Sequence, residues 1–145
     1  MKPGKIRALA ICLVRHDDRI LVTEYHDKLK RDTFYRPLGG TVEFGERGSE
    51  TVIREFMEEI HTRLVRVRYL GTLENIFTYN GQQGHEIVLV YSGVLADQYL
   101  YSLPVIIAHE DDGEEFSSFW MPIEGFRQGQ AILYPDHVLD LLPKK

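Results

Sequence analysis

Apolar and polar residues alternate along the chain in patterns that predict strands in both halves. Residues 8–14 form a short continuous apolar run, and a polar break separates them from the apolar residues 20–22. This arrangement predicts two strands joined by a tight turn. Residues 64–79 alternate with a period of two, with a break near Gly71, and a glycine-containing turn precedes the strand-like residues 86–94. A second, antiparallel hairpin is therefore expected.

The remaining segments add shorter elements. Residues 34–38 are predicted to be extended because the residue before a proline is disfavoured from helical backbone angles. Residues 116–121 alternate as a last strand, and residues 26–32 and 110–115 are polar and predict loops. Residues 135–142 begin with proline and predict a short closing helix.

An acidic helix is predicted in the middle of the chain, with Ser49 as its N-cap. Its helical periodicity predicts one buried apolar stripe, made of Val52, Ile53, Phe56, Met57 and Ile60. The opposite side carries three crowded carboxylates, those of Glu55, Glu58 and Glu59. Like charges at these spacings repel one another. The helix therefore carries either a solvated acidic face or a site for a cation.

Composition narrows the class of protein. The 145 residues are 43% hydrophobic, which is enough for one domain with a core, so residues 1–145 are expected to form a single domain. The net charge of −5 argues against bulk binding to nucleic acid or to an anionic membrane. No signal peptide or membrane span is recognisable, so a cytoplasmic protein is expected. The only cysteine, Cys12, lies in an apolar run and is expected to be a core residue.

The glycine-rich segment before the helix changes the interpretation of its charges. Gly40, Glu46, Arg54-Glu55 and Glu58-Glu59 follow one another at the spacing of the Nudix hydrolase signature, G-x5-E-x7-R-E-U-x-E-E-x-G-U, which the chain therefore resembles. The departures are Phe56 at the first aliphatic position, Thr62 at the last, and His61 in place of the final glycine. These changes are expected to alter the exit of the helix rather than the charged positions.

The resemblance implies a fold and a metal site. The fold is α+β, the Nudix fold, an α/β/α sandwich around a mixed β-sheet. Glu55, Glu58 and Glu59 would bind Mg²⁺ or Mn²⁺, with a backbone carbonyl of Gly39 or Gly40 as a further ligand. Arg54 would pair with Glu46 and fix the loop on the helix. Hard divalent ions prefer such oxygen ligands.

Two glutamates are candidates for the general base. Glu58 is the first, within the signature, and Glu86 is the second, because Nudix members differ in which glutamate acts. The alternative for Glu86 is a surface carboxylate at a strand end. Glu43 is a further, accessory ligand candidate.

The substrate-binding candidates lie around the glycine-rich segment. Arg36 could grip a phosphate, or form a salt bridge with a neighbouring acid. Gly39 and Gly40 let the backbone approach the phosphates closely. Tyr35, with Phe34, Phe77 and Tyr79, could stack on a nucleobase, or belong to the core.

The resemblance implies metal-dependent hydrolysis of a phosphoanhydride bond in a nucleoside diphosphate linked to another moiety. The substrate classes left open are nucleoside triphosphates, ADP-ribose or nucleotide sugars, and dinucleoside polyphosphates. The alternative is a non-catalytic nucleotide-binding regulatory module of Nudix fold. A small-molecule substrate is the expected partner, with no membrane or nucleic acid, and a homodimer remains open.

Overall fold

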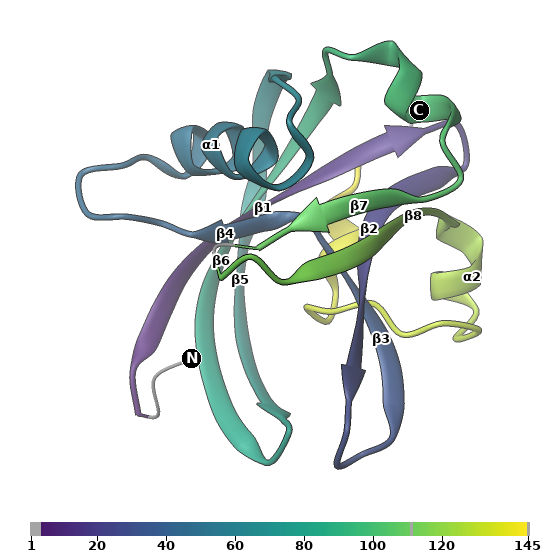
Figure 1. Ribbon diagram of the computed structural model, residues 1–145. Coiled ribbons are helices and arrows are strands. Elements are labelled where there is room, and N and C mark those ends of the chain that lie inside the picture. Colours follow the sequence, from purple (N-terminus) through teal and green to yellow (C-terminus); the bar gives the residue numbers. More distant parts are fainter. Residues whose placement is uncertain (1–3, 111, 145) are drawn as a thin grey trace.

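A computed structural model describes residues 4–110 and 112–144, whose strands form a mixed eight-stranded sheet (Figure 1). The strand order is β5-β6-β1-β2-β8-β7, with β3 paired to β2 and β4 paired to β1. The strands are β1 (Ile6–His16), β2 (Arg19–Asp27), β3 (Asp32–Pro37), β4 (Gly39–Thr41), β5 (Leu64–Tyr79), β6 (Gln82–Leu95), β7 (Ile106–His109) and β8 (Glu115–Pro122). The helices are α1 (Gly48–Ile60) and α2 (Ile123–Arg127), with 3-10 helices η1 (Gln98–Ser102) and η2 (Val138–Leu141).

Strand β1 lies inside the sheet and is buried on both faces, as its continuous apolar run allows. It runs parallel to β6, with Ile6 opposite His85 at one end of the ladder. It pairs with β2 only beside the turn, so the expected first hairpin forms at its tip and the two strands then diverge. The hairpin of β5 and β6 is confirmed, and the expected break near Gly71 is one of two irregularities in its register.

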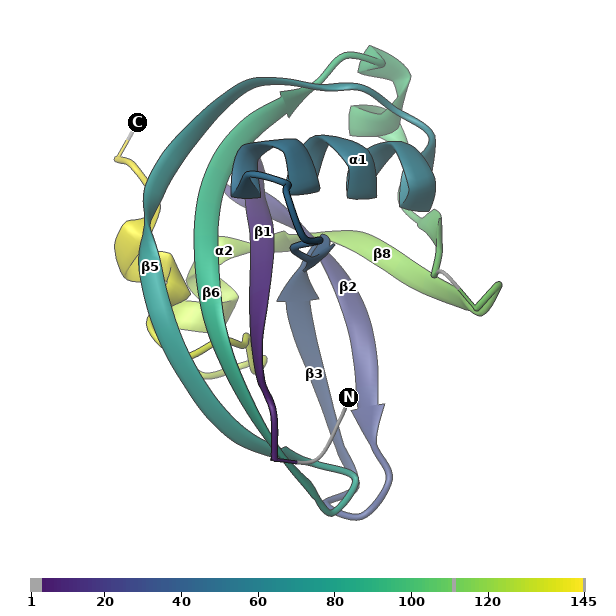
Figure 2. The same cartoon turned by 90° about the vertical axis from the view of Figure 1, so that its left-hand side faces the viewer.

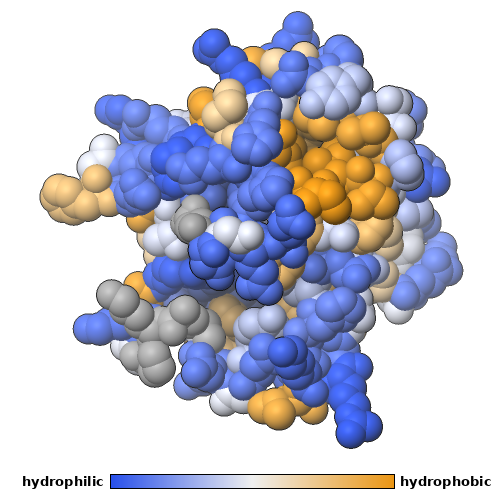
Figure 3. All heavy atoms as spheres, viewed as in Figure 1, coloured by the Kyte–Doolittle hydropathy of each residue, from blue (hydrophilic) through white to orange (hydrophobic). Residues whose placement is uncertain are grey.

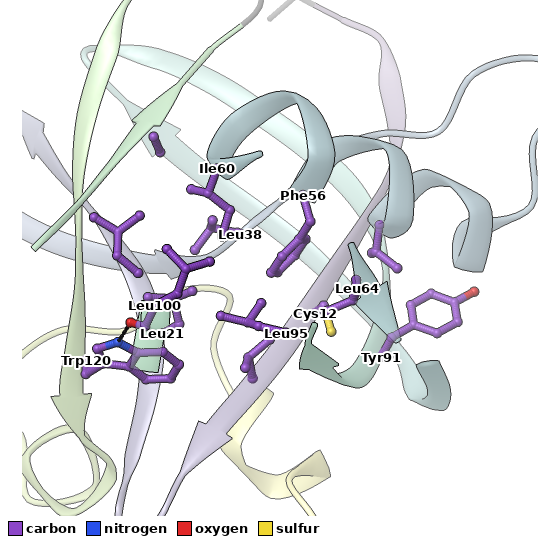
Figure 4. Packing of buried hydrophobic residues seen from close by; sticks show 14 of the residues in the cluster. Cys12, Leu21, Leu38, Phe56, Ile60, Leu64, Tyr91, Leu95, Leu100 and Trp120 are labelled. Atoms are coloured by element: carbon purple, nitrogen blue, oxygen red, sulfur yellow. Dashed lines mark hydrogen bonds between the residues drawn. The ribbon is translucent and has the colours of Figure 1, made fainter. Parts of the chain in front are cut away.

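Side chains of β1 alternate between two apolar clusters, one on each side of the sheet. Ala10, Cys12 and Val14 belong to the cluster that α1 covers, shown in Figure 4 around Phe56 and Trp120. The other cluster includes Leu9, Ile11 and Leu13 together with residues of α2 and η2. Figures 1 and 2 show α1 on one side of the sheet and α2 on the other. The expected α/β/α arrangement is therefore confirmed.

The predicted apolar stripe of α1 is only partly correct. Val52, Phe56 and Ile60 are buried, but Ile53 is 39% exposed and Met57 is 48% exposed. Two of the acidic residues, Glu55 and Glu59, are buried as well, and the Glu55 side chain lies against Gly40 of β4. The helix therefore buries a narrower apolar stripe and a carboxylate-bearing flank.

Both ends of α1 have a defined capping geometry. The N-cap is Arg47 rather than Ser49, and the Glu50 side chain accepts a hydrogen bond of 2.9 Å from the Arg47 backbone N–H. At the other end His61 is the C-cap and adopts the left-handed conformation, with φ of 56°. This confirms that His61 takes the place of the usual glycine at the helix exit.

One further expectation needs correction, and two predicted loops are found as turns. The closing helix is only the short 3-10 helix η2, which follows Pro135. The predicted loop within 26–32 is confirmed as a turn over residues 28–31, but it is shorter than expected, because β2 ends at Asp27 and β3 begins at Asp32. The segment 110–115 is a turn entering β8, and its residue 111 lies outside the described residues. Helix α2 was not predicted.

The β2–β3 and β5–β6 hairpins extend in the same direction away from α1 (Figure 2), and hydrogen bonds connect their tips. The Asn80 N–H donates to Asp27 over 3.1 Å, and Lys30 Nζ donates to the carbonyl of Thr78 over 2.9 Å. The face shown in Figure 3 is mainly polar and carries an apolar area over β7, where Ile107 is 46% exposed. Of the described helices, none has the length and apolar character needed to cross a membrane.

Candidate active site

Arg54 joins the loop before α1 to the helix itself. Its guanidinium donates two hydrogen bonds to the Glu46 carboxylate, from Nε over 2.8 Å and from Nη2 over 3.0 Å. Arg54 Nη2 also donates to the carbonyl oxygen of Thr41 over 3.1 Å, and the Thr51 hydroxyl donates to Glu46 over 2.6 Å. The hydrogen bonds from Arg54 lower the pKa of Glu46 to about 2. The expected pairing of Arg54 with Glu46 is present in the structure.

The same guanidinium lies between two carboxylates of α1. Arg54 Nη1 donates to Glu55 over 2.8 Å and to Glu58 over 3.3 Å. The Glu55 and Glu59 residues are buried, whereas the Glu58 side chain is 44% exposed. Arg54 thus offsets part of the repulsion among the crowded acids, and Glu58 keeps access to solvent.

Two consecutive glycines bring the backbone of β4 against its neighbours. A Cβ atom on Gly39 would lie 2.1 Å from the carbonyl oxygen of Ala10 in the adjacent strand. A Cβ atom on Gly40 would lie 2.3 Å from the carboxyl carbon of Glu55. Residues with a side chain are excluded from both positions on steric grounds. Glu55 therefore lies directly against the Gly40 backbone.

A pocket of about 540 Å³ extends from this contact toward the tips of the two hairpins. Gly39, Gly40 and Glu55 line it on the side of α1. Aromatic and charged side chains from the strands and from the C-terminal segment line the remainder, and those used below are Arg7, Tyr25, Lys30, Phe34, Arg36, Asn75, Phe77, Tyr79, Glu110 and Tyr134. This size and mixed lining suit a small organic ligand with charged groups.

Glu86 is not a surface carboxylate, so that alternative is wrong. It is 1% exposed, and it receives hydrogen bonds from Arg7, from Arg36 over 2.9 Å, and from Asn75 over 3.4 Å. Burial alone would raise the pKa of Glu86, but the two guanidinium groups outweigh it and lower the pKa below its ordinary value. Arg36 forms the expected salt bridge with an acid, Glu86, and it also lines the pocket, where it could contact a phosphate.

Tyr35 and Glu43, two further predicted site residues, do not line the pocket. Tyr35 does not line the pocket, because alternation along β3 directs it to the opposite face, where it packs against Phe126 and donates to Glu24 over 3.2 Å. Its neighbour Phe34 lines the pocket instead. Glu43 lies in the exposed loop, 3.8 Å from Arg54.

Almost the whole chain matches the model of one known protein family. The family model described as NUDIX domain matches residues 4–141. The chain belongs to the Nudix hydrolase family. Nudix hydrolases are pyrophosphohydrolases that act on nucleoside diphosphate derivatives and generally use divalent metal ions.

Individual relatives are more distant. The NAD-capped RNA hydrolase NudC of Photorhabdus laumondii subsp. laumondii is 36% identical over 67 residues, which cover 44% of this chain and 25% of that protein. The chain thus matches about a quarter of the length of that relative. A Nudix hydrolase from Nitrosomonas europaea has a TM-score of 0.63 at 18% identity, covering 94% of this chain and 86% of that one. A MutT protein from Bacillus halodurans has a TM-score of 0.55 at 18% identity, covering 93% and 77%. These two structures support the fold.

The donor groups of this Nudix site suit a hard divalent ion. Carboxylate oxygens of α1 lie beside the exposed backbone of two glycines, where no Cβ blocks approach to the Glu55 side chain. Among residues 4–110 and 112–144, no three acidic, His or Cys side chains already converge as a metal-binding group. The Glu58 side chain on the same helix is 44% exposed and is therefore open to solvent.

Several pocket residues were not predicted. Arg7 lies opposite Glu86 in the parallel ladder of β1 and β6, and this pairing cannot be deduced from local sequence patterns. Tyr25 donates to Glu110 over 3.2 Å, and both line the pocket. Tyr134 comes from the C-terminal segment and packs edge-on against Phe34. Only Glu110 gave a sequence signal, as part of the acidic segment 110–115.

Proposed function

We propose that this Nudix hydrolase cleaves a phosphoanhydride bond in a nucleoside diphosphate linked to another moiety. The observation that supports it best is the contact of Glu55 with Gly40 at the pocket, with Arg54 bonded to both Glu46 and Glu55. Phosphoanhydride cleavage depends mainly on positioning and on stabilising negative charge. A carboxylate-bearing helix beside a glycine backbone meets both needs when it holds a cation.

Glu55, Glu58, Glu59 and the Gly40 carbonyl would hold Mg²⁺ or Mn²⁺. The ion would neutralise charge on the diphosphate and make water a better nucleophile. Arg54 orients Glu55 and Glu58 through its Nη1 atom, and Glu46 holds Arg54 in place. The pair of Arg54 and Glu46 thereby positions Glu55 before the substrate arrives.

Glu58 is the proposed general base. It is the most exposed of the three carboxylates on this face, so it can accept a proton from water and release it to solvent. Its hydrogen bond to Arg54 is long, at 3.3 Å, so the Glu58 side chain can break this bond and rotate toward a water molecule.

The nucleoside would occupy the aromatic part of the pocket. Phe34, Phe77, Tyr79 and Tyr134 line this part, and aromatic rings of this kind stack on nucleobases. NAD-like dinucleotides, nucleotide sugars, ADP-ribose and nucleoside triphosphates all combine a base with a diphosphate. The similarity to the NAD-capped RNA hydrolase covers a quarter of that protein. It supports including NAD-like dinucleotides among the candidates.

The experiment is a panel of these compounds with Mg²⁺ or Mn²⁺, with products identified by chromatography. Glu58→Gln is expected to lower kcat by at least a hundredfold, since general-base catalysis contributes about 10²–10⁴-fold. Glu74→Gln is the matched control, because Glu74 is exposed on β5 and lies outside the pocket. No turnover of the whole panel, with tight nucleotide binding retained, would instead identify a non-catalytic binding module.

A further inference from the structure

Three side chains form one row across the adjacent strands β1, β6 and β5, beside the pocket. In the β-ladders, Arg7 of β1 lies opposite Glu86 of β6, and Glu86 lies opposite Asn75 of β5. Directly paired residues project to the same face of a sheet. This register explains why Arg7 and Asn75 both donate hydrogen bonds to Glu86.

Arg36 reaches the same carboxylate from the other hairpin. It lies on β3, its Nη2 donates to Glu86 Oε1 over 2.9 Å, and its guanidinium carbon lies 6.0 Å from the centre of the Phe77 ring. Its side chain is 18% exposed. Glu86, on the β5–β6 hairpin, is therefore joined to the β2–β3 hairpin by Arg36 and to β1 by Arg7.

The charges in this cluster do not cancel. Two guanidinium groups share one carboxylate, so the excess positive charge belongs to the cluster of Arg7, Arg36 and Glu86 itself. Arg7, Arg36 and Asn75 line the pocket, whereas Glu86 does not and is only 1% exposed. The carboxylate thus lies behind the guanidinium groups, and a ligand in the pocket meets the arginines.

Arg7 also retains hydrogen-bonding capacity. Within the described part of the chain, its buried Nε atom has no hydrogen-bond partner. Buried polar atoms in proteins are normally paired, and this donor is an exception. A guanidinium group offers a planar set of donors that matches phosphate oxygens.

We propose that Glu86 is a positioning residue that holds Arg7 and Arg36 together as one binding site for a phosphate group of the substrate, and that it does not act as the general base. This inference rests on the proposed function, because it assigns the substrate phosphate to that pocket. Since Glu86 contacts the arginines and not the pocket, removing it should affect substrate binding more than the chemical step.

The first test compares steady-state kinetics of Glu86→Gln, Arg7→Gln and Arg36→Lys with the Glu74→Gln control. We expect KM to rise by about tenfold to a hundredfold in the three variants, as for the loss of a charge-assisted hydrogen bond, with kcat changed much less. Arg36→Lys keeps the charge and loses the fork of donors, so an effect on KM reports binding geometry. Thermal unfolding of each variant identifies those that fail to fold.

Two outcomes would overturn the assignment. A large loss of kcat in Glu86→Gln at unchanged KM, together with loss of the acidic limb of the pH profile, would make Glu86 a base. Unchanged KM in both arginine variants would remove the phosphate site. If Glu86→Gln does not fold, Arg7→Gln still decides, because Glu86 remains paired with Arg36 in that variant.

A second test separates this inference from the proposed function. Binding of inorganic pyrophosphate to the metal-free protein is measured by calorimetry, so that neither catalysis nor a metal ion is needed. We expect Arg7→Gln and Arg36→Lys to weaken binding at least tenfold and Glu74→Gln to leave it unchanged. That result without turnover would reject the hydrolase proposal alone, whereas turnover with equal pyrophosphate binding in all variants would reject the phosphate site alone.

Discussion

The ion pair between Glu46 and Arg54 predicts a specific dependence of stability on pH. The pKa of Glu46 falls from 4.5 to about 2 on folding, because Arg54 donates hydrogen bonds to its carboxylate. A group with a lowered pKa stabilises the folded protein fully above its unfolded pKa and ceases to do so as the pH falls through its folded pKa. The stabilisation from Glu46 is therefore present above pH 4.5 and lost as the pH falls toward 2.

The magnitude follows from the same shift. At about 1.36 kcal/mol per pKa unit, the change corresponds to about 3.4 kcal/mol before screening. The Glu46 side chain is 16% exposed and lies near the surface, so solvent screening reduces this value to about 1–2 kcal/mol. Glu46→Gln should therefore lower the free energy of unfolding by about 1–2 kcal/mol at pH 7.

The assay is urea unfolding of metal-free wild type and Glu46→Gln between pH 7 and pH 2.5. The difference between the two proteins should shrink steadily below pH 4.5 and be much reduced at pH 2.5, where the wild-type carboxyl begins to gain a proton in the folded state. Glu43→Gln is the control, because Glu43 lies in the same loop with 67% of its side chain exposed. A difference that stays constant across this range would refute the reasoning, since it would not arise from ionisation.

Three further predictions test other parts of the structure. Gly40→Ala should weaken Mn²⁺ binding at least tenfold by displacing Glu55, as measured by paramagnetic resonance, whereas Gly125→Ala, whose added Cβ meets nothing closer than 3.6 Å, should not. His61→Gly should raise the free energy of unfolding by about 0.5–1 kcal/mol, because glycine adopts the left-handed conformation without steric cost; a loss of stability in urea unfolding would contradict this. Cys12 should not react with a thiol reagent until the protein unfolds, since it is fully buried and burial raises the pKa of its thiol; rapid labelling of the folded protein would count against this packing.

Local pattern was sufficient where a feature depends on residues close in sequence. The resemblance to the Nudix signature implied the pairing of Arg54 with Glu46 and pointed to His61 at the glycine position, and both features involve residues close in sequence. The β5–β6 hairpin likewise joins consecutive strands across a short turn. Such contacts lose little chain entropy on closure and are specified by nearby side chains.

Features that depend on distant segments could not be deduced in this way. From sequence alone, Glu86 could be either a general base or a surface carboxylate. Its partners Arg7 and Arg36 come from strands remote in sequence, so its burial was not predicted. The exposure of Met57 was also missed, since periodicity defines a helix face but not how widely the neighbouring strands cover it.

The sequence by itself therefore determined the family signature, the acidic helix, the loop that Arg54 holds, and most of the strands. Only the tertiary structure decided which side chains line the pocket. The parallel pairing of β1 with β6 places Arg7 beside Glu86, and the alternation of β3 turns Phe34 toward the pocket and Tyr35 away from it. The physical reason is that strand register and the choice of face are fixed by packing across the whole sheet, where a shift of one residue exchanges the two faces.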